Sequence, residues 1–184
     1  MLTNDFAQVD NEDMGNLAIK SAKISVVGLP AVGKSTLTKL IRGQRTSNMY
    51  KPTMGFQLRN TKLQGISFKI WDFGGQKSFL KNHLSKYVKG SDIIFVVTDS
   101  TPKNVLATKE LAEHAKSLVS EDCEIVAIAN KQDLPGHMSS ERVENVLQIN
   151  TFPMVAIDPE KRLYMIKLIQ TLTGYVEKKK LGEM

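Results

Sequence analysis

The chain has 184 residues, of which 41% are hydrophobic and 24% are charged, and its formal net charge is +6; these values suit a single soluble domain with a sizeable core. Its longest unbroken apolar runs, such as residues 93–97, are far shorter than the roughly 20 residues that cross a bilayer. Because the chain has a single cysteine, Cys123, it cannot form an internal disulfide or a zinc cluster of cysteines. We therefore expect a cytoplasmic protein, and because the basic residues are scattered we do not expect it to bind nucleic acid.

Residues 1–19 are predicted to be an N-terminal extension. They contain four carboxylates and no basic residue: Asp5, Asp10, Glu12 and Asp13. Their apolar residues at helical spacing are Leu2, Phe6 and Val9. Two interpretations stay open, a disordered tail and a short amphipathic helix that contacts a membrane or the domain itself. The domain is expected to cover residues 20–180, followed by a tail at residues 181–184.

Beyond residue 22, short β-branched runs alternate with helix-like stretches. The strand-like runs are residues 24–27, 66–71, 93–98 and 125–129. Two stretches show a helical period of apolar positions that we expect to be buried: Val105, Leu111, Ala112, Ala115, Leu118 and Val119, and then Leu163, Ile166, Ile169, Leu172 and Val176. This alternation is typical of βαβ units and predicts an α/β fold with a parallel sheet.

The first strand-like run leads into a phosphate-binding motif. Residues 28–35 read G-L-P-A-V-G-K-S, the G-x-x-x-x-G-K-[ST] pattern, and the helix-like residues 36–42 follow. The glycines let successive N–H groups point inward, and the helix adds its positive N-terminal end. Lys34 is expected to reach the β- and γ-phosphates, and the Ser35 hydroxyl to ligate Mg²⁺. The predicted nucleotide-binding residues here are Gly28, Ala31, Val32, Gly33, Lys34, Ser35 and Thr36.

Residues 130–133 read N-K-Q-D and follow the last of the strand-like runs. The Asp133 carboxylate can accept hydrogen bonds from N1–H and the exocyclic amino group of guanine, whereas adenine presents an acceptor there. The Lys131 stem can lie over the base, and Asn130 can tie this loop to the phosphate loop. The tetrapeptide alone also suits an exposed polar turn, but together with the phosphate loop it favours guanine recognition.

Two further motifs lie between these sites, P-T-M-G-F at residues 52–56 and W-D-F-G-G-Q at residues 71–76. With N-K-Q-D-L-P at residues 130–135, they resemble the Arf/Sar/Arf-like branch of the Ras-type GTPases over roughly residues 23–175. The resemblance implies a P-loop NTPase fold, a three-layer α/β/α arrangement with a six-stranded, mostly parallel sheet, one antiparallel strand and about five helices. It implies a small GTPase that binds GTP and GDP with Mg²⁺ and hydrolyses GTP slowly, as a switch.

The resemblance also assigns roles to four residues. Thr53 would complete Mg²⁺ coordination when the γ-phosphate is present, and Asp72 would hold the metal through water. Gly75 would offer its N–H to the γ-phosphate, and Gln76 would orient the attacking water. Together with Lys34, Gly75 and Gln76 form the predicted catalytic set.

Residues 56–61 and 66–71 flank a Leu-Gln-Gly turn and are predicted to form a β-hairpin. In proteins that carry the same motifs the hairpin slides in register between nucleotide states, and the same spacing makes this motion a hypothesis here.

Several positions depart from the family pattern. Pro30 stands where Arf proteins usually have Asp, and its ring is expected to crowd Gln76 or an incoming arginine. Residue 2 is Leu2 rather than the glycine that is myristoylated. The final nucleotide loop is represented by V-A-I at residues 155–157, in which Ala156 is the candidate backbone donor to the guanine oxygen.

The resemblance makes residues 52–56 and 71–76 the two switch segments. The expected partners are an exchange factor, a GTPase-activating protein and effectors at these switch segments, with the protein itself a monomer. The stretch between the first helix-like segment, which ends at residue 42, and Thr53 is about ten residues long. It is too short for an inserted domain that supplies an arginine in cis, so a partner is expected to supply this arginine. Membrane traffic and peripheral membrane contact stay open. Two rival functions are a GTP-binding scaffold or receptor subunit with negligible hydrolysis, and a P-loop ATPase or nucleotide kinase.

Overall fold

The computed structural model describes residues 21–45, 56–63, 66–73, 84–86 and 88–183. Thr53, Gly75 and Gln76, and the predicted N-terminal extension, lie outside these residues. No helix among the described residues has both the length and the hydrophobicity needed to cross a membrane.

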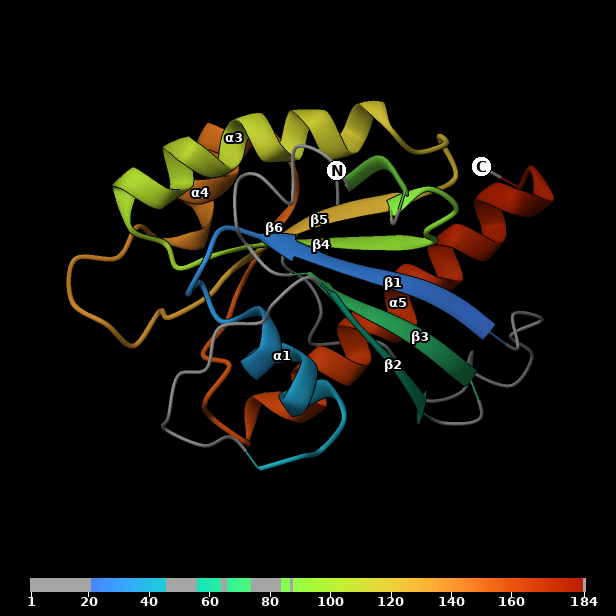
Figure 1. Cartoon of the computed structure of the whole chain (residues 1–184), viewed down its shortest axis with the longest axis horizontal. Coiled ribbons are helices and arrows are strands. Elements are labelled where there is room, and N and C mark those ends of the chain that lie inside the picture. The colour runs from blue at the N-terminus through green and yellow to red at the C-terminus, as the bar shows by residue number, and fades with distance from the viewer. Residues whose placement is uncertain (1–20, 46–55, 64–65, 74–83, 87, 184) are drawn as a thin grey trace.

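A six-stranded sheet forms the centre of the domain (Figure 1), in the order β2-β3-β1-β4-β5-β6. The strands are β1 (Ser21–Gly28), β2 (Phe56–Leu63), β3 (Ile66–Phe73), β4 (Ile93–Thr98), β5 (Glu124–Ala129) and β6 (Thr151–Pro153). β2 runs antiparallel to β3, and the other neighbouring pairs are parallel. The predicted sheet, with one antiparallel strand, is confirmed.

Helices cover both faces of the sheet, which confirms the three-layer arrangement (Figure 1). The helices are α1 (Lys34–Ile41), α3 (Pro102–Ser117), α4 (Ser140–Leu147) and α5 (Lys161–Leu181), and residues 84–86 and 88 are also helical. In Figure 1, α3 and α4 lie on one face, and α1 and α5 on the other. Because both faces are covered, all six residues of β4 are buried.

The side chains of β4 alternate between two hydrophobic cores. Phe95 packs in the cluster that contains residues of α1 and α5, whereas Val96 packs in the cluster that contains residues of α3. This follows from the two-residue period of a strand. The sheet is therefore held from both sides, and the loops at its carboxyl edge start from fixed positions.

The buried stripe of α5 differs from the predicted one at its first position. Leu163 is 61% exposed, whereas Met165, Ile169 and Leu172 are buried. At 100° per residue, Leu163 lies roughly 160° around the helix from Met165, so it faces away from the sheet. The prediction for Leu163 is wrong. In the first stretch, Leu118 and Val119 follow the end of α3 and are partly buried.

The last helix, α5, ends at Leu181. Gly182 follows it with φ +70, in the left-handed conformation that commonly ends a helix.

Candidate functional site

The phosphate-loop motif connects the carboxyl end of β1 to α1, and glycine is required at both its ends. A Cβ atom on Gly28 would lie 2.3 Å from the backbone oxygen of Val97 in β4. Gly33 has φ +102, and a Cβ atom there would lie 2.2 Å from Nδ2 of Asn130. Larger residues at either position would push the loop away from the neighbouring strand or side chain. These two glycines therefore allow the loop to approach β4 and Asn130 closely.

Lys34, the first residue of α1, lies inside this loop. It is 6% exposed, and its Nζ donates a hydrogen bond of 2.7 Å to the carbonyl of Leu29. The helix N-cap is Gly33, which has no side chain to accept from the first-turn amides of α1, and Ser35 and Thr36 follow on that turn. An anion at this position would meet a buried ammonium group and the amino end of a helix.

Asn130 joins the phosphate loop to two loops that follow other strands. Its Nδ2 donates to the Val32 carbonyl at 2.9 Å, and its Oδ1 accepts from the Ala156 backbone N–H at 2.9 Å. Asn130 is 2% exposed, so both bonds are shielded from water. We call residues 130–133 the predicted base loop. The prediction that Asn130 ties this base loop to the phosphate loop is confirmed.

Ala156 has a different acceptor from the one predicted. Its N–H, proposed from the sequence as a donor to the guanine oxygen, donates to Asn130 in this structure. The buried Ala156 therefore supports the site by fixing the Asn130 side chain.

Lys131 and Asp133 present their side chains at the outer side of the base loop. Lys131 has φ +62, and its Nζ donates to the Ala31 carbonyl at 2.8 Å, a second link between the two loops. Asp133 is exposed and has no hydrogen bond or ion pair with another described residue. Its carboxylate can therefore accept donors from a ligand without first breaking a contact within the described chain.

Two residues of this region were not predicted from the sequence. Ser100 is fully buried, and its Oγ donates to the Asn130 carbonyl at 2.8 Å. Gln132 donates from Nε2 to Ser100 Oγ at 2.8 Å. The sequence position of Ser100 could have indicated a role in the site. Ser100 lies two residues after a fully buried strand, and therefore at the edge where open α/β sheets bind ligands.

The Asp72 backbone lies beside β1. Asp72 pairs with Val26, two residues before the phosphate-loop motif, and with Gln57 on the other side. The β2–β3 pairing from Phe56 with Phe73 to Leu63 with Ile66 confirms the predicted hairpin. The sliding of this hairpin stays a prediction.

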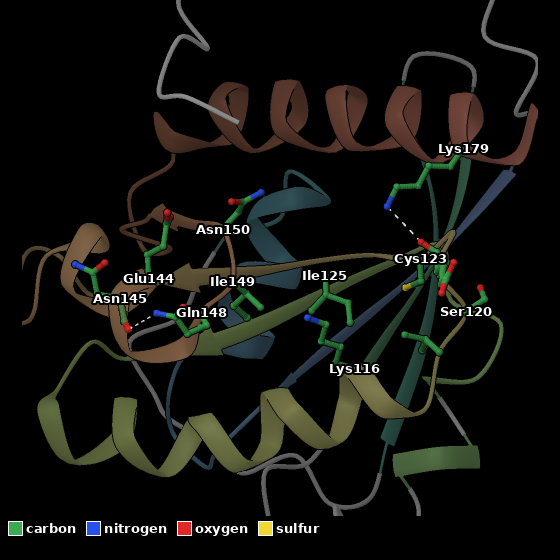
Figure 2. A pocket seen from close by; sticks show the side chains of 12 residues that line it. Lys116, Ser120, Cys123, Ile125, Glu144, Asn145, Gln148, Ile149, Asn150 and Lys179 are labelled. Carbon is green, nitrogen blue, oxygen red and sulfur yellow. Dashed lines mark hydrogen bonds between the residues drawn. The ribbon is translucent and has the colours of Figure 1, made fainter. Parts of the chain in front are cut away.

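A cavity of about 660 Å³ is lined by residues of α3 and α4 and by the segments that lead into β5 and β6 (Figure 2). It is bordered by Lys116 of α3, Glu144 of α4 and Lys179 of α5, and by Cys123 just before β5. None of the predicted nucleotide-binding residues lines it. The candidate site is therefore the amide-lined loop and not this cavity.

The sequence is similar to one protein family and to several of its members. The model of the ADP-ribosylation factor family matches residues 11–180. The ADP-ribosylation factor-like protein alp41 of Schizosaccharomyces pombe is 32% identical over 137 residues, 72% of each chain. ADP-ribosylation factor-like protein 2 of Dictyostelium discoideum is 32% identical over 139 residues, 72% of this chain and 73% of the relative. The protein of the same name from Drosophila melanogaster is 28% identical over 134 residues, 71% of each chain.

The fold also matches a solved structure, that of the Arl6 small GTPase of Trypanosoma brucei with the bound nucleotide analogue GppNp. The TM-score is 0.65 at 16% sequence identity, and the match covers 82% of this chain and 98% of the other. This similarity concerns the fold.

Proposed function

The chain belongs to the ADP-ribosylation factor family and is a small GTPase, and from this premise we propose that it is a switch that binds GTP or GDP with Mg²⁺ and hydrolyses GTP slowly. The observation that carries the proposal is the Asn130 side chain, which links the phosphate loop at Val32 to the loop at Ala156. A phosphate cradle and a base-reading loop joined in this way form one site for a whole nucleotide.

Guanine is the base that fits Asp133. Its carboxylate offers acceptors alone, and guanine offers two donors on the matching edge. Adenine would place an acceptor against the carboxylate, and each polar group left unpaired on binding costs about 1–3 kcal/mol. We therefore expect a preference for guanine of well above tenfold.

Mg²⁺ suits the oxygen groups that the chain provides. Ser35 would be a direct ligand, Thr53 would join it in the GTP state, and Asp72 would act through water; hydroxyl and carboxylate oxygens are the donors that Mg²⁺ prefers. When bound, the ion neutralises charge on the phosphate oxygens.

Hydrolysis would depend on Lys34, Gly75 and Gln76. Lys34 would stabilise charge on the phosphates, the Gly75 N–H would bind the γ-phosphate, and Gln76 would orient water. An arginine from a GTPase-activating protein would raise the rate about 10³- to 10⁵-fold. An exchange factor and effectors would act at the switch segments, in membrane traffic or another process at a membrane periphery.

The second candidate is a nucleotide-loaded scaffold or receptor subunit with negligible hydrolysis. Pro30, exposed on the phosphate loop, favours it, whereas Gln76 favours turnover. Single-turnover GTP hydrolysis by the unsubstituted protein and by Gln76→Leu distinguishes the two, because a scaffold would show no difference between them.

Isothermal titration calorimetry with GTP, GDP and ATP in the presence of Mg²⁺ tests the binding proposal. We expect GTP and GDP to bind far more tightly than ATP. Equal affinities for guanine and adenine nucleotides, or binding of neither, would contradict it.

A further inference from the structure

A partly buried hydrogen-bond network supports the predicted base loop. The Ser100 hydroxyl donates to the Asn130 carbonyl and accepts from Gln132 Nε2, both at 2.8 Å. Ser100 has φ +63, a conformation that is uncommon for residues other than glycine, and it is fully buried. Both the donor and the acceptor function of this hydroxyl are therefore used to hold the loop that begins at Asn130.

Gln132 connects this loop to two others. Its Nε2 also donates to the Met138 carbonyl at 3.0 Å, in the segment that leads to α4. Its backbone N–H donates to the Met154 carbonyl at 3.2 Å, just after β6. The Met138 N–H in turn donates to the Ser100 carbonyl at 2.7 Å, which closes a ring of contacts. Gln132 thus fixes the base loop to the segments before α4 and after β6.

The neighbouring Asp133 has no comparable support of its own. Its carboxylate is exposed and has no partner among the described residues. The backbone around it forms a turn in which the Leu134 N–H donates to the Lys131 carbonyl at 3.1 Å. No contact with a described residue fixes the Asp133 carboxylate, so its position depends on the backbone of the turn, which the bonds of Gln132 and Ser100 hold.

We propose that Ser100 and Gln132 are positioning residues for base selection, which hold the base loop so that Asp133 meets the N1–H and the exocyclic amino group of guanine. This inference rests on the proposed function of Asp133. It gives the third residue of N-K-Q-D a role, although its side chain points into the protein's own loops. Loss of the bond from Ser100 to the Asn130 carbonyl, or of the bond from Gln132 to Ser100, would let the turn around Asp133 move. We expect this movement to weaken mainly the contact between Asp133 and the exocyclic amino group of guanine.

The test compares GDP with inosine diphosphate, which lacks that amino group, and with ADP. Equilibrium affinities are measured by calorimetry for the full chain and for Ser100→Ala and Gln132→Met. There are two matched controls. Ser25→Ala removes a buried hydroxyl of β1 that lies 2.7 Å from the Ser91 hydroxyl. Gln170→Met replaces a buried glutamine of α5. Thermal denaturation of each variant reports stability separately.

We expect the GDP affinity of both site variants to fall about tenfold and that of inosine diphosphate to fall much less, because the lost bond acts through the amino-group contact. Both controls should keep the unsubstituted ratio of the two affinities, even where their melting temperature falls. The inference is overturned if Ser100→Ala and Gln132→Met have the same ratio of GDP affinity to inosine diphosphate affinity as the unsubstituted protein. This holds whether the two affinities are unchanged or fall by the same factor. Failure of the unsubstituted protein to prefer GDP over ADP would instead reject the proposed function.

Discussion

A Cβ atom on Gly33 would lie 2.2 Å from Nδ2 of Asn130, the atom that donates to Val32. The phosphate loop and the base loop are therefore in direct contact at this point, with no space for a methyl group between them. The two halves of the site are organised together, and a change at either residue should affect both phosphate and base binding.

Gly33→Ala is expected to lower GDP affinity at least tenfold and to destabilise the fold. The methyl group would displace the Asn130 amide, and φ +102 adds backbone strain of about 1–2 kcal/mol for a residue with a side chain. Gly136→Ala is the control, because φ is +75 there and no atom lies within 4 Å of the added methyl group. Calorimetry and urea denaturation measure both. Equal GDP affinity in the two variants would show that the contact with Asn130 has no role.

Asn130→Ala is expected to destabilise the protein by about 2–6 kcal/mol and to weaken GDP binding. The substitution leaves the Val32 carbonyl and the Ala156 N–H without their buried partner, at about 1–3 kcal/mol each. Asn145→Ala, at an exposed position of α4, should be nearly neutral. Urea denaturation monitored by circular dichroism compares them. If the free energy of unfolding of Asn130→Ala equalled that of Asn145→Ala, the two side-chain hydrogen bonds of Asn130 would make no contribution to stability.

The sheet and the two loops could be predicted because their signals are local. A β-branched run followed by G-x-x-x-x-G-K-[ST], or by N-K-x-D, already places each motif at the carboxyl end of a strand. Asn130 could be assigned to the phosphate loop on that basis.

The remaining contacts depend on tertiary packing. Ser100 and Gln132 are 32 positions apart, and their bond requires the left-handed conformation of Ser100, which nothing in its neighbours' identity indicates. The eight-residue α4 and the three-residue β6 are too short for a clear period. Leu163 fits a helical pattern, yet the face that packs on the sheet is centred on Met165.

Pro30→Gly is expected to increase single-turnover GTP hydrolysis several-fold. Pro30 is exposed on the phosphate loop, and its ring is predicted to restrict Gln76 or an incoming arginine. Rapid-quench measurement of phosphate release from a preloaded complex gives the rate. An unchanged rate, with GTP affinity also unchanged, would count against crowding by Pro30.

The raised pKa of the Cys123 thiol should make the stability of the protein depend on pH. Burial raises the pKa of its thiol from 9.0 to about 12, and the carboxylates of Asp92 and Glu124 add to the rise. Between these pH values the unfolded state loses the thiol proton and the folded state keeps it, so the free energy of unfolding should fall as the pH rises.

The comparison with Cys123→Ala isolates this contribution. Urea denaturation between pH 8 and pH 11 should show a steeper loss of stability for the unsubstituted protein. The native thiol should also react with iodoacetamide at pH 8 much more slowly than the unfolded thiol. Parallel stability curves for the two proteins would contradict the raised pKa.

Base selection by the Asp133 carboxylate is tested most directly by calorimetric titration of the unsubstituted protein and of Asp133→Asn with GDP and with xanthosine diphosphate. Xanthine carries an acceptor where guanine carries the amino group, and an asparagine amide can donate to it. We predict that the unsubstituted protein prefers GDP and that the variant prefers xanthosine diphosphate. A variant that still prefers GDP would contradict the account.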